Sequence, residues 1–279
     1  MLAQPVYDRI GGQYREGRRE EPRIAAALLA ALGGASPVVN VGAGPGSYEP
    51  RDRPVVAVEP SAVMAGQRPP GAAPSVRARA EALPFGDGAF GAAMAVLTVH
   101  HWTDRARGLA EMIRVADGPV VLFVRDPQAV PAWWLHHYFP ASRRLEARRE
   151  TPLDQFARLL GRPLEVIPVP IPAGCADGFN GAYWRRPGAY LDPRVWRPMS
   201  ALALIPDADR EEGMRRLRAD LDSGEWHRRW GHLLALEELD LGYRVVVAAP
   251  DRQSSTNRET RHGQDHLRRA DRGRVQGGP

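Results

Sequence analysis

The stretch VVNVGAGPG, residues 38–46, decides the fold class of this 279-residue chain. Val38–Val41 are apolar except for Asn40 and show no regular polar alternation, which is typical of a strand buried on both faces. The run leads directly into glycines at 42, 44 and 46, which permit a tight turn and leave backbone N–H groups bare for a ligand. Such a turn lies at the carboxyl edge of a parallel sheet, where α/β proteins bind ligands. The sequence therefore predicts an α/β fold with a binding site at this turn.

Regular elements on both sides of this stretch extend the same pattern. A helix is predicted from Pro22 to Gly33, because Ile24, Leu28 and Leu32 recur at helical spacing. Further strands and one further helix alternate along the chain, and we expect strands at 55–58, 75–80, 91–96 and 119–124 and a helix at 104–116. Apolar strands alternating with helices predict a doubly wound, mostly parallel, Rossmann-like sheet covered on both faces.

The composition changes after Asp126, where proline, tryptophan and arginine become frequent. Helical patterns follow at 133–138, 152–160, 207–221 and 225–230, with a possible strand at 164–169, before LGYRVVVAA at 241–249 returns as a buried strand. We therefore expect a core of residues 1–126 and 241–250. Residues 127–240 would hold the remaining core elements and an inserted, mainly helical cap over the substrate, and residues 251–279 a disordered, arginine-rich tail.

Charge and composition exclude several classes of function. The chain has no lysine, which excludes Schiff-base and pyridoxal-phosphate chemistry and the lysine-bearing phosphate loop. Its formal net charge is +5, but seven arginines and four acidic residues in 251–279 place most of that excess in the tail. The remaining chain is nearly balanced, so a nucleic-acid partner is not expected.

The sequence also predicts no targeting signal, no membrane span and no internal disulfide. The longest apolar runs fall far short of the roughly 20 residues that a membrane span needs, and Met1–Arg9 lack the apolar segment of a signal peptide. The single cysteine, Cys175, cannot form an internal disulfide. We expect a cytoplasmic protein with no membrane partner.

An acidic residue accompanies the glycine turn. Glu59 ends the next predicted strand, seventeen residues after Gly42, where a carboxylate can accept two hydrogen bonds from the vicinal hydroxyls of a ribose. A dinucleotide site would require a glycine where Ser47 stands and a long helix, for which Pro50 leaves little room. These residues favour a ligand that carries a ribose but no pyrophosphate.

Four stretches together resemble the class I S-adenosylmethionine-dependent methyltransferases of the small-molecule, type 11-like group. They are VVNVGAGPGSYE, VAVEPS, RARAEALPFGDGAFGAAMAVLTVHHW and GPVVLFVRDP, and the resemblance covers roughly residues 5–126 and 241–249. The sequence departs from that family twice. Asn40 stands where the family usually has aspartate, and the helix after the glycine turn is nearly absent.

The resemblance implies S-adenosylmethionine as the cofactor. The glycines would pack against its methionine part, Glu59 would hold the ribose, Glu81 or its neighbours would meet the adenine, and Leu97 and Thr98 would border the sulfonium. Tyr14 and Arg18 are the local candidates for its carboxylate. The predicted cofactor residues are thus Tyr14, Arg18, Gly42, Ala43, Gly44, Gly46, Glu59, Pro60, Ala80, Glu81, Ala82, Leu97 and Thr98.

Two adjacent histidines are the candidates for catalysis. Methyl transfer mainly requires positioning of the acceptor and exclusion of water, and a base helps when the acceptor is a hydroxyl, a phenol or an activated carbon. His100 and His101 follow the fourth strand, where the resemblance places them beside the transferred methyl, and a structural role is the alternative. Adjacent histidines point in different directions and Cys175 is alone, so no metal site is predicted.

Aromatic residues of the expected cap are candidates for the acceptor pocket. Large rigid side chains suit an apolar or aromatic small molecule, although they equally suit the core of a helical cap. The predicted substrate residues are Trp102, Trp133, Trp134, His137 and Tyr183.

These observations favour a methyltransferase acting on a small apolar or aromatic molecule. The alternatives are the same fold catalysing a non-methylating cyclisation or rearrangement, an NAD-dependent oxidoreductase, and a non-enzymatic binding protein that works through its tail. Residues 97–100, Leu-Thr-Val-His, lack the Asn/Asp-Pro-Pro-aromatic motif of nucleic-acid amino methyltransferases. The acceptor's identity, the atom methylated and the oligomeric state are not predicted.

Overall fold

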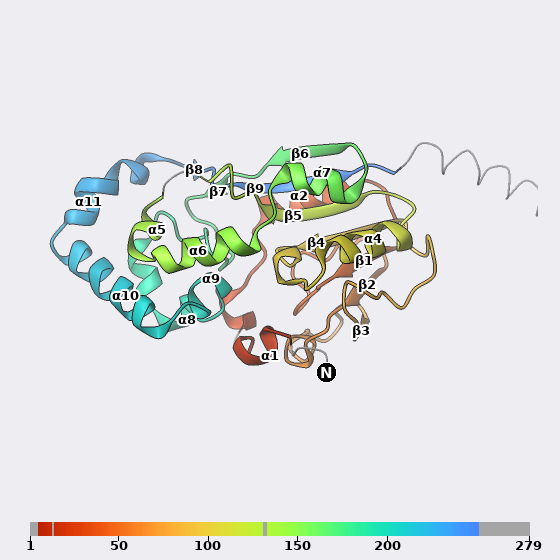
Figure 1. The fold of residues 1–279 in the computed structure, drawn as a ribbon, viewed down its shortest axis with the longest axis horizontal. Coiled ribbons are helices and arrows are strands. Elements are labelled where there is room, and N and C mark those ends of the chain that lie inside the picture. The colour runs from red at the N-terminus through yellow and green to blue at the C-terminus, as the bar shows by residue number, and fades with distance from the viewer. Residues whose placement is uncertain (1–4, 13, 131–132, 251–279) are drawn as a thin grey trace, which may run out of the picture.

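A computed structural model describes residues 5–12, 14–130 and 133–250. Its main sheet has the strand order β3-β2-β1-β4-β5-β9-β6 (Figure 1). Strand β9 runs in the direction opposite to the other six strands. The strands of this sheet are β1 (Val38–Val41), β2 (Val55–Val58), β3 (Ser75–Val76), β4 (Ala92–Val96), β5 (Val120–Arg125), β6 (Leu164–Pro168) and β9 (Tyr243–Ala248). A separate pair consists of β7 (Ile171–Pro172) and β8 (Glu238–Leu239). The predicted fold class is confirmed.

Helices surround the sheet and extend beyond one end of it. The α-helices are α1 (Tyr7–Ile10), α2 (Pro22–Leu32), α3 (Ala62–Ala65), α4 (Arg105–Val115), α5 (Trp134–Tyr138), α6 (Pro140–Arg149), α7 (Leu153–Leu160), α8 (Pro193–Trp196), α9 (Ser200–Ala203), α10 (Asp207–Asp222) and α11 (Glu225–Trp230). The 3-10 helices are η1 (Tyr14–Gly17), η2 (Val99–His101), η3 (Pro187–Leu191) and η4 (Gly231–Ala235). Among the described residues, no helix is long and apolar enough to cross a membrane.

Local sequence signals explain why α2 forms where it was predicted. Pro22 occupies its first turn, and the Glu21 side chain accepts a hydrogen bond from the N–H of Arg23. Ile24, Leu28 and Leu32 are its buried residues, spaced four apart. Gly33 then ends the helix with a φ of 54°, which glycine adopts without steric cost.

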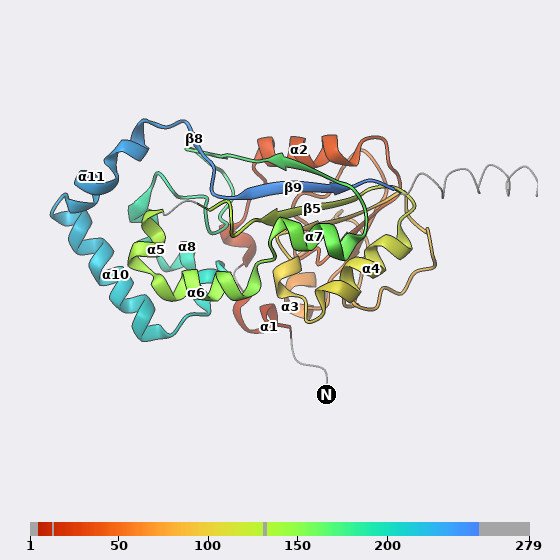
Figure 2. The ribbon, with the colours of Figure 1, turned by 45° about the horizontal axis from the view of Figure 1, so that its top comes forward.

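The two faces of the sheet are covered by different helices. The apolar stripe of α2 packs with Met94, Val121 and Val245 on one face. On the other face, α4 and α7 pack against each other and against Val39, Leu122 and Val246 (Figure 2). Strands β5 and β9 are thereby buried on both sides, which accounts for their apolar runs at 120–124 and 245–248.

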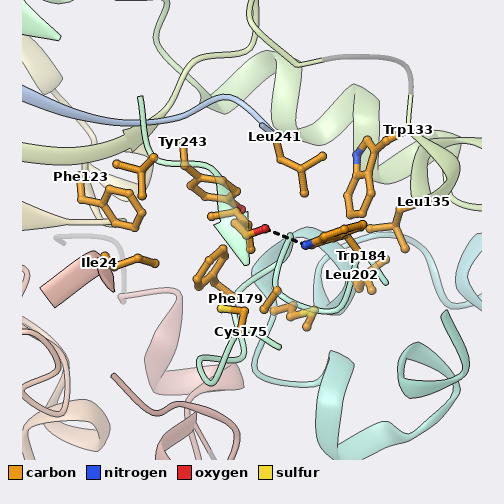
Figure 3. Close-up of a cluster of buried hydrophobic side chains, with 14 of the residues drawn as sticks. Ile24, Phe123, Trp133, Leu135, Cys175, Phe179, Trp184, Leu202, Leu241 and Tyr243 are labelled. Carbon is orange, nitrogen blue, oxygen red and sulfur yellow. Dashed lines mark hydrogen bonds between the residues drawn. The ribbon is translucent and has the colours of Figure 1, made fainter. Parts of the chain in front are cut away.

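We call residues 133–150 and 171–239 the helical lobe. It comprises α5, α6 and α8–α11, which gather beyond one end of the sheet (Figure 1). Phe123 of β5 and Tyr243 of β9 share an aromatic cluster with Phe179, and the same apolar core continues to Trp184 (Figure 3). The lobe therefore has a common core with the sheet.

The chain between the two segments of the lobe belongs to the main sheet, because β6 pairs with β9 and α7 packs against α4. Helix α6 was not predicted, because ASRRLEARR carries few apolar residues at helical spacing. The predicted tail, 251–279, lies outside the described residues.

Candidate functional site

The glycine turn after β1 has the backbone geometry that its sequence requires. Gly42, Gly44 and Gly46 have φ values of 71°, 54° and 96°, a region that residues with side chains rarely adopt. A Cβ at position 42 would lie 2.1 Å from the Oγ1 atom of Thr98, which follows β4. The turn is therefore held against the next strand of the sheet, with no room for a side chain at Gly42.

Glu59 reaches this turn from the end of β2. Its Oε2 accepts a hydrogen bond from the N–H of Gly44 at 2.8 Å, and its Oε1 accepts one from the N–H of Ser61 at 2.8 Å. The side chain is buried, and this burial raises the pKa of its carboxyl group, although the two backbone hydrogen bonds oppose the rise. The carboxylate thus fixes the turn and retains lone pairs for a ligand.

The two departures from the family pattern have a common structural setting. Residues 44–48 form turns instead of a helix, and Glu49, which follows them, pairs with Arg68 at 2.7 Å. The Nδ2 atom of Asn40 donates to Glu49 at 3.2 Å, while Arg68 also donates to the carbonyl of Gly44. An aspartate at position 40 would place a second carboxylate beside Glu49, so the amide suits this neighbourhood.

A cavity of about 920 Å³, which we call the glycine-loop cavity, lies at this edge of the sheet. Most of the predicted cofactor residues line it. They are Tyr14, Gly42, Ala43, Gly44, Glu59, Pro60, Ala80, Glu81, Leu97 and Thr98.

Three predicted cofactor residues, Gly46, Ala82 and Arg18, do not line this cavity. Gly46 lies against the ion pair of Arg68 and Glu49, and Arg18 lines a second cavity. Glu81 does face the glycine-loop cavity, but its Oε1 accepts hydrogen bonds from the N–H groups of residues 103 and 104, just before α4. Part of its hydrogen-bonding capacity is therefore already used.

A second cavity of about 830 Å³ adjoins the first, and we call it the lobe cavity. Tyr7, Tyr14 and Leu97 line both cavities, so these residues form their common wall. Leu97 has a φ of 49°, a strained conformation for a branched side chain, and such strain is concentrated at functional sites. The remaining wall comes mainly from β5, from α6 and the residues after it, and from residues 179–180 and 198–201.

The two predicted catalytic histidines fall on different sides of this common wall. His100 lines the lobe cavity and His101 the glycine-loop cavity, with their ring centroids 3.9 Å apart. The Nε2 atom of His101 lies 3.2 Å from the hydroxyl of Tyr7. Burial lowers the pKa of His100 to about 4, assisted by the positive charges of Arg149 and Arg105, and burial also lowers the pKa of His101. Both rings are therefore neutral near pH 7.

A group of charged residues in the lobe cavity was missed by the sequence analysis. Arg125, at the end of β5, pairs with Glu146 at 2.9 Å and with Glu150 at 2.8 Å. Glu146 also lies 2.9 Å from His136, whereas for Glu150 the described residues provide no further side-chain partner. Burial and the neighbouring Glu146 raise the pKa of Glu150. Arg149 lines the same cavity, and its Nη1 atom is buried with no hydrogen-bond partner among the residues that the structure describes.

The predicted substrate residues do not come together in the lobe cavity. Trp133 and Trp134 are buried in the core of the lobe, where the indole of Trp134 donates to the carbonyl of Trp184. Trp102 lines the glycine-loop cavity, and Tyr183 faces the separate hollow beside residues 192–198. His137 contacts arginines of α10 and α11. Trp133 and Trp134 thus pack in the core of the lobe, and neither lines the glycine-loop cavity or the lobe cavity.

Comparison with known proteins identifies the family. A model of the family described as "Methyltransferase domain" matches residues 39–122. A crystal structure from Anabaena variabilis, named "Putative methyltransferase from antibiotic biosynthesis pathway", is 33% identical. The match covers 82% of this chain and 97% of the Anabaena chain, with a TM-score of 0.78.

A more distant structure shares the fold alone. The [4+2]-cyclase SpnF is 14% identical, covers 88% of this chain and 94% of its own, and has a TM-score of 0.50. No curated protein matches the sequence. The seven-stranded sheet, the methyltransferase domain model and the similarity to the Anabaena protein together show that this chain belongs to the class I S-adenosylmethionine-dependent methyltransferases.

Proposed function

We propose that this protein transfers a methyl group from S-adenosylmethionine to a small molecule that has an apolar or aromatic body and is bound in the lobe cavity. The observation that carries this proposal is the pair of adjoining cavities that share Tyr7, Tyr14 and Leu97. One contains the glycine turn and Glu59, and the other lies between the sheet and the helical lobe, which provides part of its wall. A donor and an acceptor can therefore meet at the common wall without leaving the protein.

The glycine-loop cavity suits the cofactor. Bare backbone at Gly42 and Gly44 allows a ligand to approach closely, and Glu59 can accept hydrogen bonds from ribose hydroxyls. When bound, the cofactor supplies an activated methyl group on its sulfonium.

The residues of the lobe cavity would bind and orient the acceptor. Phe156, Phe179 and Met199 provide apolar surface for a ring, while His100 and Glu150 are the groups able to take a proton from an acceptor hydroxyl. His100 is neutral near pH 7, and the raised pKa of Glu150 brings that carboxyl closer to neutral pH than an ordinary glutamate. The pathway named for the Anabaena relative also supports a small-molecule acceptor.

Binding of the cofactor is tested by calorimetric titration. We expect the purified protein to bind S-adenosylmethionine and S-adenosylhomocysteine and not NAD. Absence of binding to both sulfur compounds would refute the proposal, and binding of NAD instead would favour an oxidoreductase.

The reaction itself is tested by incubating the protein with S-adenosylmethionine and a panel of small aromatic and aliphatic compounds, and by analysing the products by mass spectrometry. The panel contains alcohols and phenols, amines and carbon acids. Methyl transfer adds one CH₂ to an acceptor and converts S-adenosylmethionine into S-adenosylhomocysteine. A product of unchanged mass, with no S-adenosylhomocysteine formed, would favour a cyclisation or rearrangement. Deletion of residues 251–279 tests the alternative of a non-enzymatic binding protein that acts through its tail. Full cofactor binding and turnover in the truncated protein would argue against that alternative.

A further inference from the structure

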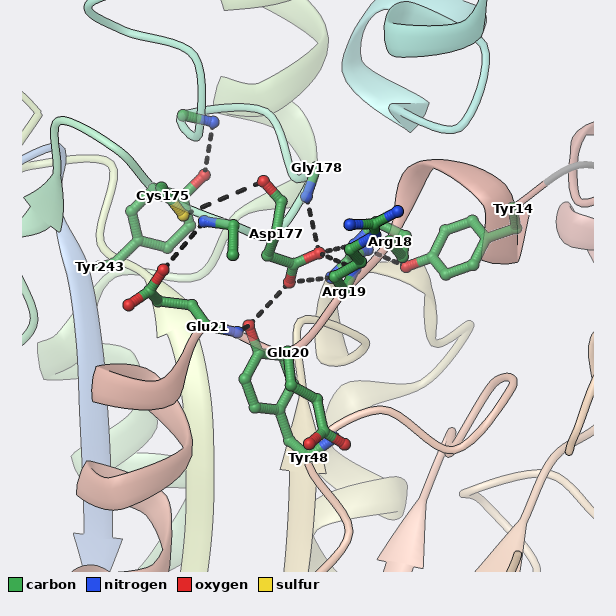
Figure 4. A network of polar contacts seen from close by, with 12 residues as sticks. Tyr14, Arg18, Arg19, Glu20, Glu21, Tyr48, Cys175, Asp177, Gly178 and Tyr243 are labelled. Carbon is green, nitrogen blue, oxygen red and sulfur yellow. Dashed lines mark hydrogen bonds and ion pairs between the residues drawn. The ribbon is translucent and has the colours of Figure 1, made fainter.

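Asp177 of the helical lobe holds together three segments that are far apart in the sequence (Figure 4). Its Oδ1 accepts hydrogen bonds from Arg18 Nε at 2.5 Å and from the N–H groups of Arg19 and Gly178. Its Oδ2 accepts one from Arg18 Nη2 at 2.9 Å and one from the hydroxyl of Tyr48 at 2.8 Å. The residue is only 1% exposed, so these partners replace water around a buried charge.

Tyr48 connects this carboxylate to the glycine turn. It follows Gly46 by two residues and has a φ of 63°, a left-handed conformation that is strained for a non-glycine residue. Its N–H donates to Glu20 at 2.9 Å, and its hydroxyl accepts from the N–H of Glu21 while donating to Asp177. The strained end of the turn is therefore held in place by contacts from outside the turn.

The lobe is docked on the N-terminal segment without space between them. A Cβ at Gly178 would lie 1.8 Å from the carbonyl oxygen of Gly17, so the two backbones are in direct contact. One residue before Asp177, the N–H of Ala176 donates to Glu21 at 2.9 Å. The position of Asp177 is thus fixed relative to residues 17–21.

Arg18 extends the network to the wall that the two cavities share. Its guanidinium donates to the hydroxyl of Tyr14, a residue that lines both cavities, and Arg18 itself lines the lobe cavity. Asp177 lines neither of them. Asp177 therefore contacts Tyr48, which holds the glycine turn, and Arg18, which contacts the common wall through Tyr14. Because Asp177 lines neither cavity, it is not placed to touch a ligand.

We propose that Asp177 is a positioning residue through which the helical lobe sets the affinity of the glycine-loop cavity for its cofactor. This inference rests on the proposed function, because it concerns binding of S-adenosylmethionine or S-adenosylhomocysteine. The carboxylate holds Tyr48, and with it the glycine turn, in the conformation that binds, and through Arg18 it holds Tyr14 at the edge of the same cavity. Linkage makes the coupling reciprocal, so cofactor binding also tightens the docking of the lobe.

The first test compares S-adenosylhomocysteine affinities by calorimetry in the full chain. Asp177→Asn keeps the size of the side chain but leaves Arg18 without its countercharge, and we expect affinity to fall at least fivefold. Tyr48→Phe removes only the hydroxyl that meets Asp177, and we expect a two- to threefold fall. If Asp177→Asn does not fold, Tyr48→Phe decides the question.

Two control variants remove similar interactions elsewhere. Tyr138→Phe deletes a phenol that donates to Asp220 at 2.7 Å within the lobe, and Asp240→Asn alters a carboxylate that pairs with Arg244 at 2.7 Å. Neither residue lines the glycine-loop cavity or the lobe cavity. We expect both controls to bind S-adenosylhomocysteine as the wild type does, even where their melting temperatures fall.

A second readout detects the coupling itself. Hydrogen exchange of the backbone amides in residues 173–182 should slow when S-adenosylhomocysteine binds to the wild type, and this change should be lost in Asp177→Asn. Equal affinities of the wild type, Tyr48→Phe and Asp177→Asn would overturn the inference, as would an equal loss of affinity in the controls. A wild-type protein that binds no S-adenosylhomocysteine would instead overturn the proposed function, and the inference with it.

Discussion

The glycine-loop cavity and the lobe cavity adjoin each other but are built in different ways. The first takes most of its wall from one stretch, residues 40–103, with additions from the N-terminal segment. The second combines side chains from segments between Tyr7 and Tyr243 that are far apart in the chain. The first cavity depends mainly on backbone conformation, and the second depends on side chains that pair over long sequence distances. A sequence therefore predicts the first cavity more readily than the second.

The largest expected effect is on the free energy of unfolding, and it tests which residues of the lobe belong to its core. Trp134→Ala should lower the free energy of unfolding by about 3–5 kcal/mol, because it deletes a fully buried indole that packs on Tyr190 and Trp226. Urea denaturation measures the loss. A loss below about 1 kcal/mol would contradict the assignment of Trp134 to the core.

The next effect concerns the backbone of the glycine turn. Gly42→Ala forces a side chain into a left-handed conformation and against Thr98, so we expect unfolding free energy to fall by about 2–4 kcal/mol. Affinity for S-adenosylhomocysteine should fall more than about thirtyfold, or about 2 kcal/mol. Gly34→Ala is the matched control, because its added Cβ would meet nothing within 4 Å. Similar behaviour of the two variants would show that the turn tolerates a side chain.

These two predictions also show why the sequence revealed one region better than the other. The sequence predicted the glycine turn and Glu59 because each of these residues meets a local requirement of the backbone. The alternation of strands and helices then predicted that they lie at the same edge of the sheet. Helix α6 buries the charged Glu146, which pairs with Arg125 and contacts His136, and no local sequence pattern indicates such long-range contacts.

The aromatic residues illustrate the same limit. Trp133 and Trp134 suit a pocket or a core equally well by composition, and only the packing of the lobe distinguishes the two. Arg18 was placed near the cofactor from the resemblance, but its guanidinium pairs with Asp177, which is 159 residues away in the sequence.

A smaller effect tests the ribose contact. Glu59→Ala should weaken cofactor binding about tenfold or more, corresponding to about 1.5–3 kcal/mol for hydrogen bonds to a charged group. Calorimetry with S-adenosylhomocysteine measures it, and Glu59→Gln, which preserves shape but not charge, should lie between the wild type and the alanine variant. An unchanged affinity in Glu59→Ala would show that the ribose is held elsewhere.

The smallest effect concerns pH and the lobe cavity. The folded state lowers the pKa of His100 to about 4 from an ordinary value of 6.5, so between these values the folded protein binds fewer protons than the unfolded chain. Stability should therefore fall as the pH falls from 6.5 toward 4, by up to about 1.4 kcal/mol per pH unit from this group. Urea denaturation at pH 7, 6 and 5 should show a shallower dependence in His100→Gln. The same slope in variant and wild type would mean that His100 is not held neutral by burial.

The central claim is that the glycine-loop cavity holds the cofactor and the lobe cavity holds the acceptor. A crystal structure with S-adenosylhomocysteine tests it most directly. The account predicts ribose hydroxyls on the carboxylate of Glu59 and the sulfur atom at the common wall beside Tyr7 and Leu97, with the lobe cavity left for the acceptor. A nucleoside bound in the lobe cavity, or a ribose away from Glu59, would contradict it.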